Sequence, residues 1–474
     1  MSDAATPVDV AVIGGGPAGY EAALVAAQLG ASVVVVEAEG IGGACVLHDC
    51  VPSKTFIASA EAMTGYRDNG EFGVRTSSAE PPVVDAGVVH DRVKRLALAQ
   101  STDIRTKLEK AGVTIVDGHG RLGADTLGHT HEVVVTRSGG RESTEKLAAR
   151  TVLIATGAKP RTLRGSLPDG ERILTWQQLY DLRQLPERLV VIGSGVTGAE
   201  FADAYLALGA HVTLVSSRDR VMPHEDTDAA LLIERVFRDR GMEILSNARA
   251  SRVAVRGDGV SVTLEDGRTV DGSHALITVG SIPSTDGLGL VEYGVETTEA
   301  GHVVVDRVSR TSVPGVYAAG DCTGLLLLAS AAAMQGRTAM WHALGEPVAP
   351  LRLRTIAANV FTDPELAAVG LSQADLEAGE GPARQVTLPL AGNARAKMGS
   401  LADGFVKLFC RPGSGRVLGG VVVAPRASEL ILPIALAVEV GLTVDQLAHT
   451  ATIYPSLSGS IAEAARQLML HELE

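Results

Sequence analysis

The chain has 474 residues, of which 46% are hydrophobic, and this is enough to build about three packed domains. Its formal net charge of −13 argues against a nucleic-acid partner, because binding to a phosphate backbone requires clustered lysine and arginine. Four cysteines in so long a chain exclude a secreted disulfide scaffold, and no basic region of a signal peptide precedes the first hydrophobic run. We therefore expect a cytoplasmic protein.

The first predicted element is a dinucleotide-binding unit at residues 8–37. A hydrophobic strand leads into Gly14-x-Gly16-x-x-Gly19, and an alanine-rich helix and a second strand ending on Glu37 follow. Gly14 allows the turn from strand to helix, Gly16 lets the backbone approach a pyrophosphate, and Gly19 lets the helix pack on the strand. We expect the pyrophosphate at the helix N-terminus and a ribose hydroxyl on Glu37.

Two cysteines follow in the stretch IGGACVLHDCVPSK. Residues five apart on a regular α-helix have Cα atoms roughly 8–9 Å apart, whereas a disulfide usually needs less than about 7 Å. A bridge between Cys45 and Cys50 therefore requires an interrupted helix, and Pro52 disturbs normal helical hydrogen bonding nearby. The stretch predicts a redox-capable pair, and two buried free thiols are the alternative. We expect His48, between the cysteines, to be a solvated or packing residue rather than a base.

Residues 188–220 repeat the dinucleotide-binding pattern, with Gly193, Gly195 and Gly198 in the same three roles. Two such units predict two dinucleotides, and FAD with NAD(P)H is the natural pair, because a flavin accepts the hydride that a nicotinamide gives.

The second strand of this repeat ends on Ser216 and Ser217, where an acid would mark NAD preference, and Arg218 and Arg220 follow. Without a carboxylate there is no repulsion toward a 2′-phosphate, and a guanidinium attracts one. The loop therefore predicts that NADPH is at least tolerated, and a solvated surface loop is the alternative.

Several later segments complete the pattern, and one of them raises the question of a membrane span. Glu429–Leu442 is apolar but short and contains Pro433, so it predicts a buried helix rather than a membrane span. The other segments are TVLIATGAKP (Thr151–Pro160), TSVPGVYAAGD (Thr311–Asp321), VFTDPELAAVG (Val360–Gly370), NARAKM (Asn393–Met398) and GGVVVAPRASELI (Gly419–Ile431).

With the cysteine stretch, these segments resemble the flavoprotein disulfide reductases, the family of dihydrolipoamide dehydrogenase and glutathione reductase, along essentially the whole chain. The resemblance implies an α/β homodimer with two Rossmann-like domains, for FAD and NAD(P), and a C-terminal α+β dimerisation domain. The implied ranges are 1–158 for the first part of the FAD domain, 159–282 for the NAD(P) domain, 283–350 for the return to the FAD domain and 351–474 for the dimer-interface domain.

The resemblance also implies roles for individual residues. Cys45 would exchange with substrate and Cys50 would touch the flavin ring. Lys54 would pair with Glu200 beside the flavin, where a cation stabilises the negative charge that develops on hydride transfer. No metal site is expected. The residues expected at the two cofactors are Gly14, Gly16, Pro17, Ala18, Gly19, Glu37, Ala38, Gly43, Ala44, Cys45, Lys54, Gly120, Ala155, Thr156, Gly157, Gly193, Gly195, Val196, Thr197, Gly198, Glu200, Ser216, Ser217, Arg218, Gly280, Gly320, Asp321 (on the ribityl chain), Leu328 and Ala329.

One part of the family pattern is missing. Disulfide reductases of this family end with a histidine and an orienting glutamate that reach the partner's active site, but here Tyr454 and Gly459 stand in those places. A tyrosine with a pKa of about 10 cannot shuttle a proton at neutral pH as an imidazole does. Since a positioned acid–base contributes about 10²–10⁴ in rate, we expect efficient disulfide turnover to fail.

Hydride transfer from NAD(P)H to the flavin should persist, so electrons need an acceptor that requires no thiol exchange. The substitutions resemble the NAD(P)H:quinone reductase branch of the family and predict a quinone-type acceptor. Tyr454 would line the acceptor pocket or donate a hydrogen bond to a quinone oxygen, or else pack at the dimer interface. The alternatives are a soluble pyridine nucleotide transhydrogenase, a dithiol reductase that uses Cys45 and Cys50, and a flavin-loaded module without catalysis.

Overall fold

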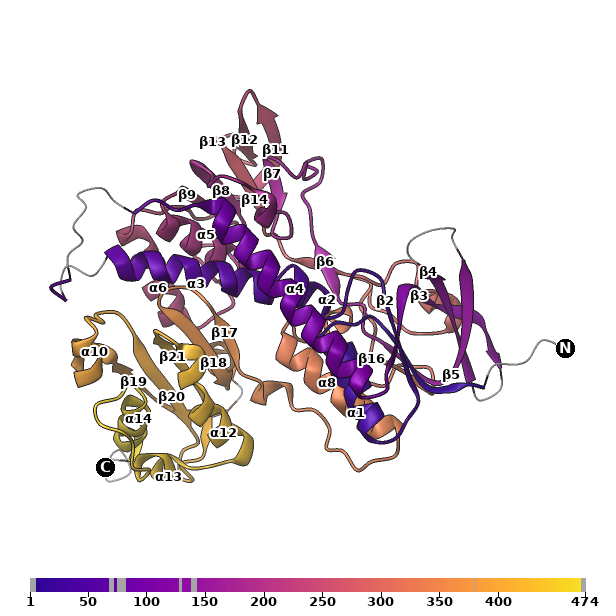
Figure 1. Cartoon of the computed structure of the whole chain (residues 1–474). Helices are drawn as coiled ribbons and strands as arrows, with labels where there is room; N and C mark the ends of the chain where they lie inside the picture. Colours follow the sequence, from indigo (N-terminus) through magenta and orange to yellow (C-terminus); the bar gives the residue numbers. More distant parts are fainter. Residues whose placement is uncertain are drawn as a thin grey trace. The chain divides into compact units, whose positions relative to one another are not determined.

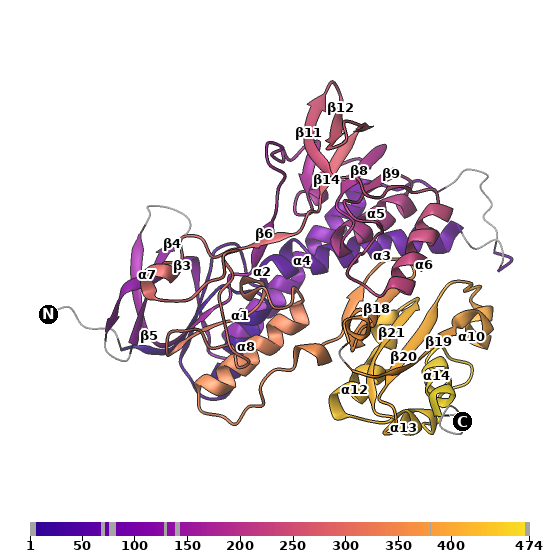
Figure 2. The same ribbon diagram turned by 180° about the vertical axis from the view of Figure 1, so that it is seen from behind.

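The computed structural model describes residues 6–67, 72–74, 82–127, 130–137, 143–379 and 381–469, without the side chains of 67 and 124–127. The chain falls into two compact units, which Figures 1 and 2 show from opposite sides. Unit 1 comprises residues 1–55, 90–161 and 280–353, and unit 2 comprises 56–89, 162–279 and 354–474. The finer division into FAD, NAD(P) and dimer-interface ranges stays a prediction.

Unit 1 is built on a six-stranded sheet. Its strands are β1 (Val8–Ile13), β2 (Val33–Glu37), β3 (Thr114–Leu127), β4 (Thr130–Arg137), β5 (Thr144–Ile154) and β16 (Val316–Ala318). β1 pairs in parallel with β2 and β5, and β16 pairs in parallel with β5, whereas β4 runs antiparallel between β3 and β5. β1 is hydrophobic on both faces because both faces are covered, as is usual for a parallel strand.

Helices α1 (Pro17–Gln28) and α8 (Ala329–Ala343) lie side by side on one face of this sheet (Figures 1 and 2). Gly336 permits their close approach, because a Cβ there would collide with the carbonyl oxygen of Ala18. The other elements of unit 1 include α2 (Gly43–Leu47), the start of α3 (Cys50–Arg67), most of α4 (Ala86–Lys110), β6 (Ala158–Pro160), β15 (Ser281–Pro283), α7 (Leu290–Tyr293) and the 3₁₀ turn η3 (Asp321–Thr323).

Unit 2 contains a second parallel sheet, in the order β10-β9-β8-β14-β7. Its strands are β7 (Ile173–Thr175), β8 (Arg188–Ile192), β9 (His211–Val215), β10 (Glu243–Leu245) and β14 (His274–Ile277). Helix α5 (Val196–Leu208) connects β8 to β9, and α6 (Thr227–Asp239) connects β9 to β10. A separate three-stranded antiparallel sheet consists of β11 (Ala250–Arg256), β12 (Gly259–Leu264) and β13 (Thr269–Gly272). The predicted α/β class is therefore confirmed.

The C-terminal part of unit 2 is an antiparallel sheet with helices around it, in the order β17-β18-β21-β20-β19. Its strands are β17 (Ala358–Val360), β18 (Glu365–Gly370), β19 (Arg384–Pro389), β20 (Phe405–Cys410) and β21 (Val417–Ala424). Its helices are α9 (Gln373–Glu377), α10 (Ala394–Met398), α11 (Ala427–Leu430), α12 (Leu432–Val440), α13 (Val444–Ala448) and α14 (Gly459–Met469).

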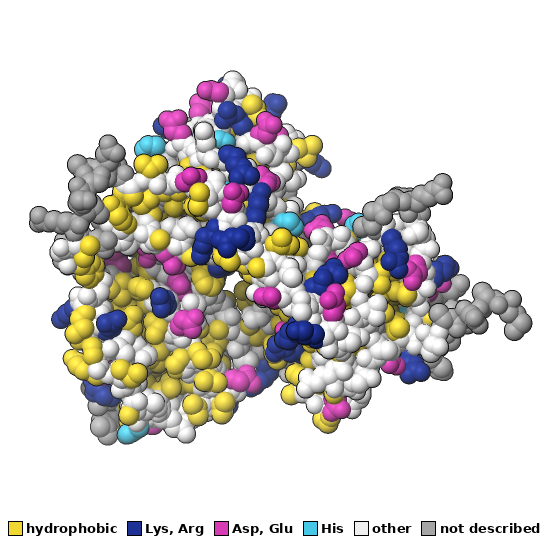
Figure 3. Space-filling model, in the orientation of Figure 1, with side chains coloured by type: hydrophobic (Ala, Val, Ile, Leu, Met, Phe, Trp, Pro, Cys, Tyr) yellow, Lys and Arg dark blue, Asp and Glu magenta, His cyan; other side chains and the backbone are white. Residues whose placement is uncertain are grey.

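The expected buried helix at Glu429–Leu442 is only partly correct. Pro433 lies in the first turn of α12, so α11 and α12 form in place of one continuous helix. Within the chain α12 buries Ile434 and Ala437 but exposes Leu432, Leu436 and Val440, which recur every four residues. Hydrophobic side chains are numerous over this part of unit 2 (Figure 3). None of the helices in the described ranges is long and apolar enough to cross a membrane.

Candidate active site

The first glycine pattern forms a tight turn between β1 and α1, at the end of the sheet where β5 also ends. Gly14 has φ 105°, and a Cβ on it would collide with the carbonyl oxygen of Ala155, just after β5. A Cβ on Gly19 would collide with the carbonyl oxygen of Gly14, whereas one on Gly16 would meet no described atom within 4 Å. Two glycines are therefore needed by the chain itself, and Gly16 leaves open space at the N-terminus of α1, where a pyrophosphate fits.

The second pattern repeats this geometry between β8 and α5. Gly193 has φ 111°, and a Cβ on it would collide with the carbonyl oxygen of Thr278. A Cβ on Gly198 would collide with the carbonyl oxygen of Gly193, and the space beside Gly195 is again open. Val196 and Thr197 begin α5 beside that space. The same division of roles in both units supports the prediction of two dinucleotide sites.

Glu37 is buried at the end of β2 and holds the first loop together. Its carboxylate accepts a hydrogen bond from the amide of Gly15, and two more from the amides of Glu39 and Gly40 at 2.7 and 3.1 Å. Ala38, the next residue, is partly exposed. The carboxylate therefore shapes the loop around Gly16 in addition to the ribose contact that the sequence predicts.

The loop after β9 separates the residues predicted near a 2′-phosphate. Ser216 is fully buried and its hydroxyl serves the loop: it accepts a hydrogen bond from Ser194 at 2.7 Å and donates one to the carbonyl of Arg218 at 3.1 Å. Ser217 and Arg218 are exposed, and Arg220 donates to the carbonyl of Pro223 at 3.3 Å. Contact with a 2′-phosphate would therefore fall to Ser217 and Arg218.

The cysteine stretch is an interrupted helix, as disulfide geometry requires. Cys45 lies in α2, Cys50 begins α3, and the chain leaves the helix between them at His48. Both thiols are free, and Cys50 forms a hydrogen bond with Cys45 that is the largest cause of a strongly raised Cys50 pKa. Burial adds to this rise and the charge of Lys54 opposes it. Cys50 is therefore a protonated thiol in this state.

His48 lies beside an acidic residue of the loop after β2. Its Nε2 is 3.7 Å from the carboxylate of Glu39, and both side chains are partly exposed. The histidine thus pairs with the loop after β2, which agrees with the expectation of a solvated or packing residue.

Tyr20 is a site residue that the sequence analysis missed. Burial raises the pKa of its hydroxyl to about 12, and the charges of Cys45 and Glu21 add to the rise, with Arg337 opposing. The side chain lies in the first turn of α1, directly after Gly19. Only its place next to the glycine pattern could have pointed to it.

The far end of the first site contains polar groups without partners. Thr156 has a buried hydroxyl without a hydrogen-bond partner, and the carboxyl group of Asp321 accepts no hydrogen bond from the described residues. Burial, and then the charge of Asp49, raise the pKa of Asp321 to about 6. The open space at Gly16, an unsatisfied hydroxyl and a carboxyl group without a partner together fit FAD, whose phosphates and ribityl hydroxyls would satisfy them.

Gln335 supports this end of the site and was also missed. It is almost fully buried in α8, and its side-chain oxygen accepts the amide of Gly320 at 2.8 Å. Gly320 has φ 83°, a conformation that favours glycine at this position. The glutamine therefore fixes the backbone directly before Asp321. Leu328 caps α8 and Ala329 begins it.

The remaining predicted residues of unit 1 lie in turns and strand ends. Gly43 and Gly157 have φ 58° and 67°, and a Cβ on Gly43 would come within 2.9 Å of the Cα of Gly16. Gly280 has φ 95°, and its carbonyl accepts the amide of Arg161 at 2.9 Å. Gly120 packs between side chains of β1 and β2. Pro17, Ala18 and Ala44 lie in the first turns of α1 and α2.

In unit 2 Glu200 is 3% exposed, and its Oε1 accepts the amide of Phe361 at 2.9 Å. Its pairing with Lys54 stays a prediction.

Tyr454 lies on a surface loop of the C-terminal part and is 86% exposed in the single chain. Gly459 begins α14, and its amide donates to the hydroxyl of Ser456 at 3.1 Å. A Cβ on Gly459 would meet only two hydroxyl oxygens, of Ser456 and Thr452, at 3.5 Å. The position therefore accepts a side chain, so the absent glutamate is a difference of sequence and not of space.

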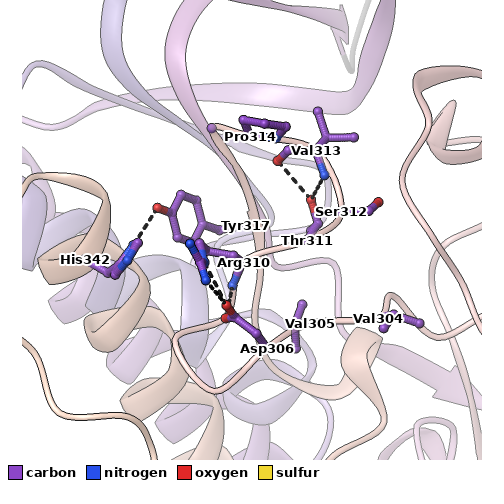
Figure 4. Close-up of a pocket in the computed structure, with 11 residues that line it drawn as sticks. Val304, Val305, Asp306, Arg310, Thr311, Ser312, Val313, Pro314, Tyr317 and His342 are labelled. Carbon is purple, nitrogen blue, oxygen red and sulfur yellow. Dashed lines mark hydrogen bonds and ion pairs between the residues drawn. The ribbon is translucent and has the colours of Figure 1, made fainter.

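A separate cavity of about 570 Å³ lies in unit 1, beside β16 (Figure 4). Four of its polar side chains bind one another in pairs: the guanidinium of Arg310 pairs with Asp306 at 2.7 Å, and the hydroxyl of Tyr317 forms a hydrogen bond with His342 at 2.8 Å. None of the predicted site residues lines it.

Comparison with known proteins gives matches along nearly the whole chain. Residues 8–336 match the family model of the pyridine nucleotide-disulphide oxidoreductases, and residues 356–465 match the dimerisation domain of that family. A protein of Mycobacterium tuberculosis H37Rv named NAD(P)H dehydrogenase (quinone) is 56% identical over 98% of this chain and 94% of its own length. A dihydrolipoyl dehydrogenase of Chlorobaculum tepidum is 34% identical over 97% of each chain.

Solved structures agree with these matches. LpdA from M. tuberculosis superimposes with a TM-score of 0.93 at 56% identity, covering 98% of this chain and 100% of the other. The flavoprotein disulfide reductase RclA from Escherichia coli has the same fold, with a TM-score of 0.84 at 24% identity over 97% and 99% of the two chains.

Proposed function

This chain belongs to the pyridine nucleotide-disulphide oxidoreductase family, an FAD- and NAD(P)H-dependent family of oxidoreductases, and we propose that it passes electrons from NAD(P)H to quinone-type acceptors. One observation carries the proposal: the chain combines two glycine turns of dinucleotide-binding geometry with a C-terminal segment in which Tyr454 and Gly459 stand where the family's acid–base dyad is expected. The name of the M. tuberculosis relative, NAD(P)H dehydrogenase (quinone), supports it.

The chain's residues have separate tasks in this proposal. Bound FAD supplies the redox chemistry, accepting a hydride from the nicotinamide and giving electrons to the acceptor. Gly16 and Gly195 admit the two pyrophosphates, Asp321 orients the ribityl chain, and Lys54 with Glu200 supplies the charge beside the flavin. Cys50 keeps its proton because its pKa is strongly raised, so it offers the flavin a neutral thiol.

Tyr454 would meet the acceptor or the second subunit of a homodimer. Ile453 and Tyr454 are 80% and 86% exposed, and α12 carries its own exposed hydrophobic face. The match of residues 356–465 to a dimerisation domain supports covering these side chains with a second copy. The proposal places the enzyme in the cytoplasm, where free Cys45 and Cys50 would stay reduced between turnovers.

Steady-state turnover with NADH and NADPH tests the proposal against four acceptors: a naphthoquinone, lipoamide, glutathione disulfide and a nicotinamide analogue. We expect rapid quinone reduction and little turnover of either disulfide. Lipoamide turnover as fast as quinone turnover would contradict the proposal, and rapid transfer only to the nicotinamide analogue would identify a transhydrogenase.

The nucleotide preference has a matched test. Arg218→Ala should raise KM for NADPH several-fold and leave KM for NADH unchanged, because its exposed guanidinium would meet the 2′-phosphate, which NADH lacks. Arg256→Ala, at an exposed arginine that ends β11, serves as the control.

A dithiol reductase is the second candidate, and the hydrogen bond between Cys45 and Cys50 favours it. Cys45→Ser distinguishes the two functions, since it would abolish disulfide reduction and leave quinone reduction in place.

A further inference from the structure

Helix α5 carries two buried carboxylates, Glu200 and Asp203, which are 3% and 4% exposed. Residues three apart on a helix share a face, and here both carboxylates bind the same short segment of the C-terminal part of unit 2. Glu200 accepts the amide of Phe361 at 2.9 Å, and Asp203 accepts the amide of Asp363 at 2.7 Å. The segment 361–363, which follows β17, is thus held by main-chain hydrogen bonds to one turn of α5.

Arg240, the C-cap residue directly after α6, completes the arrangement. Its guanidinium lies 3.3 Å from Asp203 and donates to both the carbonyl and the carboxylate of Asp363, at 2.8 and 2.9 Å. The arginine therefore ties the same residue to α5 from the other side. A hydrogen bond in which the donor or the acceptor is ionised, as with this guanidinium, is stronger than one between neutral groups.

The surrounding charges show why the guanidinium matters. Burial raises the pKa of Asp203 to about 7, while the charge of Arg240 lowers it. Glu61 of α3 also faces this region: burial raises its pKa first, and the charges of Glu365 and Asp363 add to the rise, with Arg426 opposing. Without Arg240, a buried carboxylate and the Asp363 side chain would face each other without their shared cation.

We propose that Asp203 and Arg240 are positioning residues of the hydride-transfer site. They fix the segment 361–363, and the amide of Phe361 in turn fixes one carboxylate oxygen of Glu200. Glu200 lies one turn into α5, whose N-terminus forms the second dinucleotide site. The inference rests on the proposed function in one respect, the assignment of Glu200 to the charge beside the flavin.

The first test measures structure and requires no turnover. Arg240→Met and Asp203→Asn should speed amide hydrogen exchange in the segment 358–364 at least tenfold in the FAD-loaded enzyme without nucleotide. Arg238→Met is the matched control, since Arg238 lies two residues earlier and pairs with Glu234 on its own helix at 2.8 Å. Unchanged exchange in both variants, or equal acceleration in the control, would overturn the inference.

The second test asks whether the two residues act through Glu200. In rapid mixing with NADPH and no acceptor, Arg240→Met should slow flavin reduction about tenfold at saturation, since small displacements of a positioned group have effects of this size. The dissociation constant for NADPH should stay within twofold, because the open space at Gly195 is untouched.

A double-mutant comparison decides between positioning and general damage. If Arg240 acts through Glu200, Arg240→Met should cost little more in a Glu200→Gln background. Equal additional loss in both backgrounds would refute the proposed role. Because no acceptor is present, an enzyme that failed to reduce quinones would disprove the proposed function and leave this comparison intact.

Discussion

Lys407 should be one of the most costly single residues to replace in unit 2, because its ammonium group is fully buried. It lies on β20 and binds both carboxylate oxygens of Asp226 at 2.8 Å, Asp228 at 2.6 Å and the side-chain oxygen of Gln373 at 3.2 Å. Asp226 also caps α6 by accepting the amides of Asp228 and Ala229. One ammonium group therefore joins the C-terminal sheet to the first turn of α6.

Lys407→Met keeps most of the side-chain volume and removes the charge. Asp226 has a side chain only 2% exposed, so it would remain as a buried carboxylate without its cation. Breaking a buried pair in this way costs about 3–5 kcal/mol. Asp228 adds little to the cost, because its side chain is 54% exposed and water can solvate it.

Equilibrium urea unfolding of the FAD-loaded protein measures this loss, followed by far-ultraviolet circular dichroism. Lys397→Met, at an exposed lysine of α10, is the control and should change the free energy of unfolding by less than about 0.5 kcal/mol. The double variant Lys407→Met/Asp226→Asn should be more stable than Lys407→Met alone, because the uncompensated charge is gone. A loss of less than about 1 kcal/mol in Lys407→Met would show that the buried pair contributes no more than a surface pair.

Three further changes test the site and its surroundings. The pKa of Asp203 is raised from 3.8 to about 7 in the folded protein, which therefore binds this proton more tightly than the unfolded chain. The resulting contribution to stability, up to about 4 kcal/mol, should be lost as pH rises from about 4 to 7. Unfolding measured across this pH range should show that slope, and Asp203→Asn should flatten it. Tyr454→His should not restore lipoamide turnover, because Gly459 leaves the imidazole without an orienting carboxylate. Tyr454→His/Gly459→Glu should raise the rate of lipoamide turnover by about 10²–10⁴. Equal rescue by the single change would contradict the need for the glutamate. Gly16→Val should abolish FAD retention, and Gly195→Val should weaken NADPH binding while FAD stays bound, because each new side chain enters space that the chain leaves open. FAD content and NADPH titration measure the two effects. Loss of both cofactors in Gly195→Val would show that the sites are not independent.

The elements that the sequence predicts well are those whose cause is local. The strand before Gly14 and the helix after it follow from a hydrophobic run and three glycines, and two of the three collide with nearby backbone if a Cβ is added. The break between Cys45 and Cys50 follows from the distance that a disulfide can span. No long-range information is needed for either.

The elements that the sequence does not predict depend on packing between distant segments. Lys407 and Asp226 are separated by 181 positions, and nothing in the strand FVKLFC distinguishes this lysine from a solvated one. The sequence pattern groups Ser216 with Ser217 at the predicted 2′-phosphate site, yet the Ser216 hydroxyl bonds Ser194 and the carbonyl of Arg218 inside the loop. The exposed face of α12 is not predicted, because hydrophobicity alone cannot distinguish a core from a surface that a second subunit would cover.

We propose two separable contributions for the C-terminal part of unit 2, and this chain keeps one of them. The segment around Tyr454 would act on the partner's site, and it lacks the acid–base pair that disulfide exchange requires. The segment 361–363 acts within the same chain, where it binds Glu200 and Asp203 through its backbone amides. Backbone amides remain when side chains are substituted, so this second contribution does not depend on the dyad. On the proposed function, loss of the dyad would remove the thiol chemistry and leave the support of Glu200 in place, and an enzyme in that state would still reduce its flavin and would need an acceptor of another class.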